Sequence, residues 1–224
     1  MAQVKDQAQV RVRHRVRRNP RKDAVHLFQC LLHPFAAFYG VKEEGKGSPV
    51  GSAFILIVFF FSAVMERQNT GYPFNYNDLS DLNVWLIGAK TFGLFALWVV
   101  GNWAVATWMD GEGKAAQIVV VSAYAIVPYV ASAIVTTLLS NVLLREEGVF
   151  LDYLTVVGCL WSGTLMLIGL QTIHDYGFVR NLQSMALTAM AMGIIVFLGM
   201  LFYTLFQQTY LFVYTIYNEA LFRW

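Results

Sequence analysis

Two long stretches of this 224-residue chain contain no charged side chain. They run from Ala115 to Leu144 and from Tyr153 to Ile173, and they consist mainly of apolar residues. Uncharged apolar runs of about 18 or more residues are typical of helices that cross a bilayer. Charged residues make up 13% of the whole chain, which is about half the roughly 25% of a soluble domain. These features exclude a soluble enzyme and a disordered chain.

The distribution of apolar residues predicts an all-α membrane protein with five transmembrane helices. Pro128 is expected to interrupt the third helix because it has no backbone N–H, and an interfacial turn from Leu82 to Gly88 is expected before the second. The first helix is short, and an interfacial or buried segment is its alternative. The expected spans are Val50–Met65, Thr91–Met109, Ala116–Leu143, Leu151–Ile173 and Leu182–Phe206.

Basic residues are unevenly distributed and predict the orientation of the chain. Ten of the 16 Lys and Arg residues precede residue 49, and Lys and Arg accumulate on the cytoplasmic side of membrane proteins. We therefore expect the N-terminus in the cytoplasm. An odd number of spans then places the C-terminus outside, in a multi-pass protein of the cell (inner) membrane.

Residues 1–23 form a basic arm with eight Lys or Arg residues against Asp6 and Asp23. Each basic residue near an anionic leaflet contributes roughly 1 kcal/mol of attraction, so contact with anionic lipids is the preferred interpretation. No aromatic residue separates the arginines, which argues against nucleic-acid binding. Alternation from Val10 to Arg13 would also suit a strand added to a partner's sheet. The expected lipid contacts are Arg11, Arg13, Arg15, Arg17, Arg18, Arg21 and Lys22.

Residues 24–48 are expected to form an amphipathic interfacial segment and a linker. A short helix from Ala24 to Leu32, capped by Asp23 and ended by Pro34, would place its apolar residues in the cytoplasmic interface. Cys30 lies in this helix and is expected to be a buried thiol, with acylation as the alternative.

The sequence shows no arrangement typical of catalysis or of a metal site. It has no G-x-S-x-G motif and no paired cysteines, and no acidic residue joins His26 and His33 at metal-ligand spacing. His174 is interpreted as a polar residue that stabilises the end of the fourth span. We therefore expect no enzyme activity, no cofactor and no metal.

Lys90 is predicted to lie about seven residues, or roughly 10 Å, from the external end of the second helix, counted from Leu82. A lone ammonium group at that depth is costly unless it reaches the interface or a carboxylate. Asp152 begins the fourth span on the same side of the membrane. We predict a structural ion pair between Lys90 and Asp152, with Glu146 or Glu147 as substitutes for the carboxylate.

Polar side chains inside the spans are expected to hold helices together. Ser132, Thr136 and Ser140 follow one another at intervals of four residues, so they share one helical face and can bond a neighbouring helix or backbone freed by the proline. Asn102 is expected to form an interhelical hydrogen bond. A polar conduit along these residues is the alternative.

The chain ends in aromatic residues that recur about every 3.5 positions. A helix with one aromatic stripe lies in the membrane interface or docks a partner, protein or glycan. The residues of this stripe are Phe206, Tyr210, Tyr214, Tyr217, Leu221 and Trp224.

Several residues follow one another along the chain in the order His33-Pro34, Gly113, Tyr124, Pro128, Trp161 and His174. This order resembles the Yip family, the Ypt/Rab-interacting membrane proteins and their bacterial relatives. The most specific part of the likeness is the Tyr-Ala-x-x-Pro helix, and the likeness covers about residues 30 to 206. The chain lacks the Asp-Leu-Tyr-Gly-Pro motif of eukaryotic members, so a bacterial-type member is expected. The residues that carry the resemblance are His33, Pro34, Gly113, Tyr124, Pro128, Trp161 and His174.

The resemblance implies a five-helix domain over residues 49–206 without known enzymatic chemistry. The aromatic stripe separately predicts an external amphipathic extension over residues 207–224. Bacterial members of the family often occur beside components of carbohydrate ABC importers. We therefore expect an accessory or scaffolding subunit of such an importer, with the permease and ATPase as partners. A stand-alone transporter or channel for small solutes, and a membrane-shaping or trafficking protein, are the alternatives.

Overall fold

The computed structural model describes residues 28–43, 45, 47–75 and 82–222, except for the side chain of residue 220. Within these ranges all regular structure is helical. Residues 28–32 form a helical turn that bends at His33. The helices that follow are α3 (Pro34–Glu43), α4 (Pro49–Asn69), α5 (Val84–Trp108), α6 (Ala115–Ala125), α7 (Val127–Leu139), the 3₁₀ turn η2 (Arg145–Glu147), α8 (Gly148–His174) and α9 (Phe178–Phe222).

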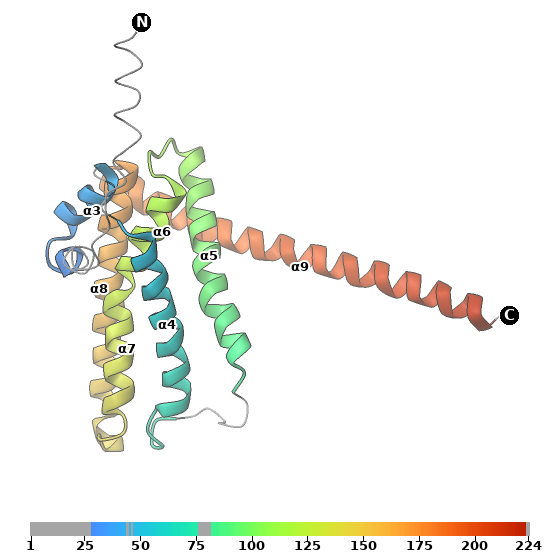
Figure 1. The fold of residues 1–224 in the computed structure, drawn as a ribbon, viewed down its shortest axis with the longest axis horizontal. Coiled ribbons are helices and arrows are strands. Elements are labelled where there is room, and N and C mark those ends of the chain that lie inside the picture. Colours follow the sequence, from blue (N-terminus) through green and yellow to red (C-terminus); the bar gives the residue numbers. More distant parts are fainter. Residues whose placement is uncertain (1–27, 44, 46, 76–81, 223–224) are drawn as a thin grey trace, which may run out of the picture.

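In the described part of the chain, five helical segments are long and apolar enough to cross a bilayer. They are α4, α5, α6 together with α7, η2 together with α8, and most of α9. The predicted all-α fold with five membrane-spanning helices is therefore confirmed, including the first span. Helices α4, α5, α7 and α8 run side by side, with α3 and α6 gathered at one end of the bundle (Figure 1). We call this the α3 end, and we call the end formed by residues 70–75 and 140–147 the opposite end.

The ends of the helices are set by capping residues rather than by hydropathy. The side chain of Asn83 accepts a hydrogen bond of 3.0 Å from the backbone N–H of Leu86 and so begins α5. The interfacial turn predicted from Leu82 to Gly88 is therefore wrong, because Val84 to Gly88 already belong to the spanning helix. At α4, Ser48 accepts from Gly51 in the same way at 3.2 Å, and Pro49 occupies the first turn.

The third span is divided between α6 and α7, as the proline predicts. Ile126 separates the two helices and Pro128 lies in the first turn of α7. The backbone N–H of Tyr129, the residue after the proline, donates a 2.9 Å hydrogen bond to Oγ of Ser162 on α8. The carbonyl of Tyr129 in turn accepts a 2.8 Å hydrogen bond from the hydroxyl of Ser132, which belongs to the predicted face of the third span.

The α3 helix is part of the core and was not predicted. Ala37, Phe38 and Val41 are buried, and α3 packs mainly on α8, where Phe38 lies beside Gly169. The interfacial segment predicted from residue 24 falls partly on residues 24–27, which lie outside the described residues. Residues 24–48 were predicted to form an interfacial segment and a linker, whereas in the structure Pro34 begins α3, whose buried residues pack against α8.

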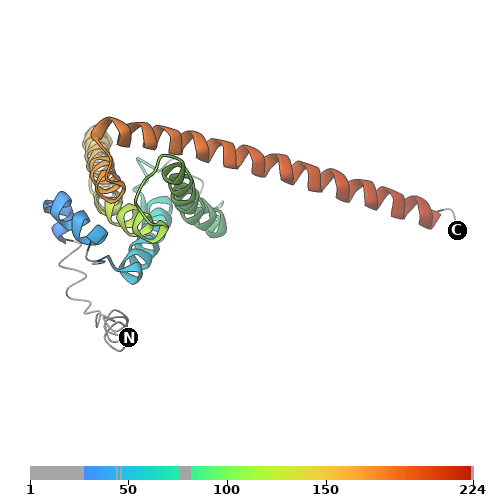
Figure 2. The ribbon, with the colours of Figure 1, turned by 90° about the horizontal axis from the view of Figure 1, so that it is seen from above.

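Helix α9 differs from the other long helices in direction. It begins where α8 ends, crosses α5 and projects away from the bundle in both views (Figures 1 and 2). Its 45 residues correspond to about 67 Å of helix. The structure shows no break at Phe206, so the predicted fifth span and the predicted extension form one continuous helix.

Candidate functional site

The α3 end of the bundle is closed by a polar junction between two turns, residues 109–114 and 175–177. The backbone N–H of Gly113 donates to Nδ1 of His174 at 3.3 Å. A Cβ atom at position 113 would lie 2.6 Å from Cε1 of this ring, so only glycine allows the approach. Asp110 and Asp175 both have a φ of 56°, a left-handed conformation that aspartate tolerates.

His174 links three helices through a chain of buried hydrogen bonds. A backbone N–H can only donate, so Nδ1 of His174 is the acceptor and Nε2 carries the proton. Nε2 then donates to Oδ1 of Asn102 at 3.1 Å, and Nδ2 of Asn102 donates to Oγ1 of Thr188 at 3.2 Å. The imidazole is therefore neutral, and the chain joins α8, α5 and α9. The predicted interhelical role of Asn102 is confirmed.

Lys42 connects α3 to this junction through an ion pair. Its Nζ lies 2.8 Å from Oε2 of Glu112 and 3.9 Å from Oδ1 of Asp175. The side chain of Lys42 is only 14% exposed, whereas that of Glu112 is 62% exposed. The hydrogen bond to Glu112, helped by the nearby Asp175 charge, raises the pKa of Lys42 above its ordinary value. The sequence analysis did not predict the ion pair of Lys42 with Glu112, because 70 positions separate these two residues.

Tyr176 completes the junction. Its ring stacks on that of His174 with centroids 5.3 Å apart, and the guanidinium carbon of Arg180 lies 5.0 Å from the centre of the Tyr176 ring. Arg180 also donates to the backbone carbonyl of Met109. Burial raises the pKa of the Tyr176 phenol. These groups bond to one another, so their arrangement fixes the turn between α8 and α9 rather than presenting a nucleophile to solvent.

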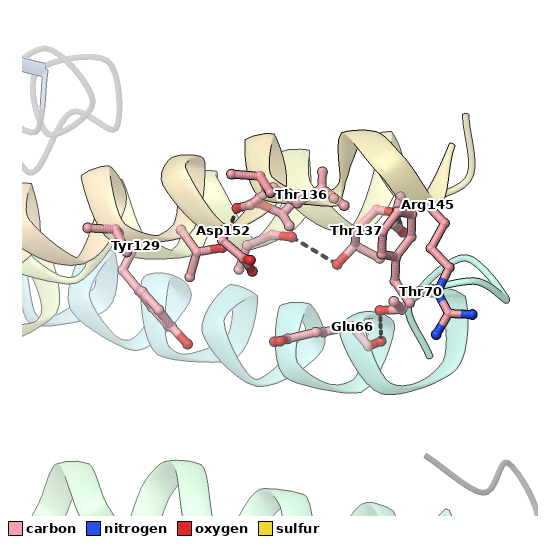
Figure 3. Close-up of a pocket in the computed structure, with 15 residues that line it drawn as sticks. Glu66, Thr70, Tyr129, Thr136, Thr137, Arg145 and Asp152 are labelled. Carbon is pink, nitrogen blue, oxygen red and sulfur yellow. Dashed lines mark hydrogen bonds between the residues drawn. The ribbon is translucent and has the colours of Figure 1, made fainter. Parts of the chain in front are cut away.

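At the opposite end, α4, α7 and α8 enclose a slot of about 680 Å³. Figure 3 shows the carboxylates of Glu66 on α4 and Asp152 on α8 directed into the same gap. Tyr129 and Arg145 lie at its two ends. Tyr129 is ten residues before the end of α7 at Leu139, so the slot extends about 15 Å along that helix.

The predicted polar face on the third span is used in three different ways. Ser132 packs against α8, where Gly158 has no side chain to obstruct it. Thr136 lines the slot, and its buried hydroxyl has no hydrogen-bond partner. Ser140 accepts a 2.8 Å hydrogen bond from the N–H of Gly71 and so holds the loop after α4. Asn102 lies at the α3 end, so these residues do not line one conduit.

The predicted ion pair between Lys90 and Asp152 is wrong. No ion pair joins Lys90 to Asp152, Glu146 or Glu147 within the described ranges. Lys90 is exposed on α5 and lines a separate pocket with Phe59, whereas Asp152 lines the slot. The physical reason is helix order: α5 packs on α4, α6 and α9, while α8 packs mainly on α3, α6 and α7.

The described part of the chain contains no group of three or more His, Cys, Asp or Glu residues that could hold a metal ion. The two cysteines there, Cys30 and Cys159, are not joined in a disulfide. Cys30 is buried, as predicted.

The sequence model of the Yip1 domain matches residues 28–205. This range covers most of the chain and includes α3 to α8 and the first part of α9. The chain belongs to the Yip1 domain family. Neither the comparison with curated proteins nor that with solved structures gives a match.

Several residues that carried the resemblance to the Yip family now have a structural role. Gly113 and His174 are direct partners in the junction. The hydroxyl of Tyr124, which is buried at the centre of the core, accepts a 3.3 Å hydrogen bond from the N–H of Ser48. This contact fixes the start of α4 against α6. Pro128 separates α6 from α7, and Pro34 begins α3.

Other predicted residues lie away from the two sites. Trp161 is about half exposed on α8, and His33 is exposed at the bend before α3. The basic residues from Arg11 to Lys22 lie outside the described residues, as does Trp224. The remaining five residues of the predicted C-terminal stripe are exposed on α9: Phe206, Tyr210, Tyr214, Tyr217 and Leu221. Every residue from Phe206 to Tyr217 is exposed as well, so over this stretch the stripe is not a distinct face of the helix.

Proposed function

We propose that this Yip1 domain protein is a non-enzymatic scaffolding subunit that joins a larger membrane complex through helix α9. The single observation that carries the proposal is that α9 is strongly apolar but almost entirely unburied. In its most apolar stretch of 18 residues only 6% is buried, although this stretch has the highest mean hydropathy among those of the five spans. A helix that is apolar on all sides belongs in a membrane or among other helices.

The contacts of α9 with its own chain are confined to its first part. Gly101 on α5 approaches the backbone of Thr188 and the side chain of Met192, and Asn102 bonds Thr188. From residue 197 to 217 every side chain is exposed. This leaves about 30 Å of apolar helix for contact with helices of other subunits. Aromatic residues, which dominate binding hot spots, recur along it.

The proposal also specifies which proteins are the partners and in which membrane the chain lies. Bacterial members of the Yip family often occur beside carbohydrate ABC importers, and this association supports a permease and an ATPase as the partners of α9 and of the N-terminal arm. The proposed location is the cell (inner) membrane. In this arrangement the N-terminus and the α3 end face the cytoplasm, where the arm contacts anionic lipids, and the C-terminus is external.

Affinity purification of the full chain in a gentle detergent, followed by mass spectrometry, tests the proposal. Recovery of permease and ATPase subunits in a fixed ratio is expected. A variant that ends at Phe206 removes the exposed end of α9 but keeps the contacts with α5, so it is expected to fold and to lose the partners. Recovery of the intact chain alone, or equal recovery with the shortened variant, would contradict it.

The orientation is tested separately. A protease added to sealed cells or right-side-out vesicles is expected to remove a C-terminal tag and to spare an N-terminal one. Protection of the C-terminal tag would contradict the proposed arrangement.

A further inference from the structure

We propose that the slot between α4, α7 and α8 binds the ammonium group of a small organic cation, with the carboxylates of Glu66 and Asp152 as its counter-ions. This site is independent of the scaffolding function, because it lies at the opposite end of the bundle from α3 and does not involve α9.

The size of the slot is the first argument. Its volume of about 680 Å³ lies within the range of about 300–1,000 Å³ for small-molecule sites. Its walls are formed by α4 and by the consecutive helices α7 and α8, and the loop residue Phe74 closes part of it. Gly148 permits this closure, because a Cβ atom there would lie 2.7 Å from the Phe74 ring.

The charge of the slot is the second argument. Its lining contains two carboxylates, Glu66 and Asp152, and one guanidinium, Arg145, so its formal charge is −1. Among the described residues, no ion pair joins either carboxylate to a basic side chain. Both side chains are exposed and lie at the same end of the bundle, Glu66 three residues before the end of α4 and Asp152 four residues after the start of α8. A cation bound between them would be attracted by both charges.

The uncharged part of the lining defines the class of cation. Hydroxyls of Tyr129, Thr136 and Thr155 line the slot, and that of Thr136 is buried without a partner. No cluster suited to a metal ion is found in the described ranges. Two carboxylates and several hydroxyls instead match an ammonium group, whose N–H donors need acceptors on more than one side. A soluble amine or the ethanolamine headgroup of a lipid can supply this group.

Ethanolamine is the probe for the soluble source, and ethylene glycol is its neutral control of almost the same shape. Binding to the full chain in maltoside micelles is measured by isothermal titration calorimetry. Ethanolamine is expected to bind at least tenfold more tightly than ethylene glycol, because only the amine carries a positive charge. This comparison needs no variant. Equal binding of the two compounds, or no binding of ethanolamine, would overturn the proposal.

Isosteric variants identify the counter-ions. Glu66→Gln and Asp152→Asn are each expected to weaken ethanolamine binding about tenfold or more. Glu146→Gln removes a neighbouring exposed carboxylate that does not line the slot, so it is expected to leave the affinity unchanged. Gel filtration and circular dichroism show whether each variant folds. Unchanged affinity in both slot variants would overturn the assignment.

Arg145 separates the two sources of the ammonium group. Arg145→Gln removes a positive charge from the slot, so ethanolamine is expected to bind more tightly and phosphoethanolamine more weakly. In nanodiscs of phosphatidylglycerol, added phosphatidylethanolamine is expected to compete with ethanolamine if the lipid headgroup enters the slot. Lack of competition assigns the site to the soluble amine. An unchanged ethanolamine affinity in Arg145→Gln would contradict the charge argument.

Discussion

Gly158 on α8 faces Ser132 on α7 so closely that a Cβ atom at position 158 would lie 2.5 Å from the Ser132 Cβ. The backbone carbonyl of Pro128 would lie 3.2 Å away. Small residues allow close approach of helix backbones in membranes, where association depends on packing and on hydrogen bonds. The contact therefore sets the distance between α7 and α8, which also form two walls of the slot.

The first prediction is that Gly158→Ala destabilises the bundle by about 1–3 kcal/mol, because the added methyl group forces the two helices apart. Thermal unfolding in maltoside micelles, followed by circular dichroism at 222 nm, measures the effect. The matched control is Gly163→Ala on the same helix, where an added Cβ meets nothing within 4 Å. The control is expected to be neutral or stabilising by about 0.5–1 kcal/mol. Equal effects of the two changes would contradict the proposed close contact.

The second prediction concerns the chain His174–Asn102–Thr188. Asn102→Ala leaves the buried Nε2–H of His174 without an acceptor, so a loss of about 1–3 kcal/mol is expected. Thr188→Val removes the other partner of Asn102. Because the two residues are hydrogen-bonded, the double variant is expected to cost less than the sum of the single variants. Strict additivity in thermal unfolding would show that the bond contributes nothing.

The fold was largely predictable because long apolar stretches of sequence indicate helices that cross a bilayer. The apolar stretch that forms α6 and α7 was predicted to be a span on this basis, and the position of Pro128 predicted that the two helices are separate. The position of α3 was not predictable, because Phe38 is buried only through contact with α8 near Gly169. A contact between two residues so far apart in the sequence cannot be recognised from the residues around either of them.

The candidate sites were less predictable than the fold for the same physical reason. Spacing placed Lys90 and Asp152 correctly within their helices, but spacing within one helix does not reveal which helices are neighbours. The slot required Glu66, at the end of α4, to face Asp152 across the bundle. The predicted first span ended at Met65, so Glu66 fell just outside it, whereas α4 continues to Asn69. Asn102 was recognisable as an amide inside an apolar span that needs a partner, whereas the bonds of His174 to Gly113 and Asn102 were not predicted.

The third prediction is a pH dependence that comes from Lys42. The hydrogen bond to Glu112 raises the pKa of the Lys42 ammonium in the folded protein. A group with a raised folded pKa stabilises the protein below its ordinary pKa, near 10.4 for lysine, and this contribution is lost as the pH rises through the folded pKa. The melting temperature of the wild type relative to Lys42→Met is therefore expected to be constant from pH 7 to 9 and to fall above about pH 10.5.

Glu112→Gln provides a second way to check the same interaction. The amide keeps the shape of the carboxylate but removes its charge, so the wild type is expected to lose its advantage over this variant in the same alkaline range. Thermal unfolding at a series of pH values measures both comparisons. A difference that does not change between pH 9 and pH 11.5 for either variant would show that the pair adds nothing to stability.

The fourth prediction is that Cys30 is unreactive in the folded protein. The residue is 1% exposed, and burial raises the pKa of its thiol to about 12. At pH 8 only about one thiol in 10⁴ would then be ionised, and the thiolate is the nucleophile. In a Cys159→Ser background, N-ethylmaleimide is expected to leave Cys30 unmodified in maltoside micelles and to label it fully in sodium dodecyl sulfate, as read by intact mass spectrometry.

An exposed position in the same short helix supplies the control for this measurement. Leu32 is 56% exposed, so a Leu32→Cys variant that also carries Cys30→Ser and Cys159→Ser is expected to react within minutes under the folded conditions. Rapid labelling of Cys30 in micelles would mean that the contact between residues 28–32 and the core opens readily. Such opening would also make the thiol accessible to acylation, whereas a protected Cys30 rules out that modification in the folded state.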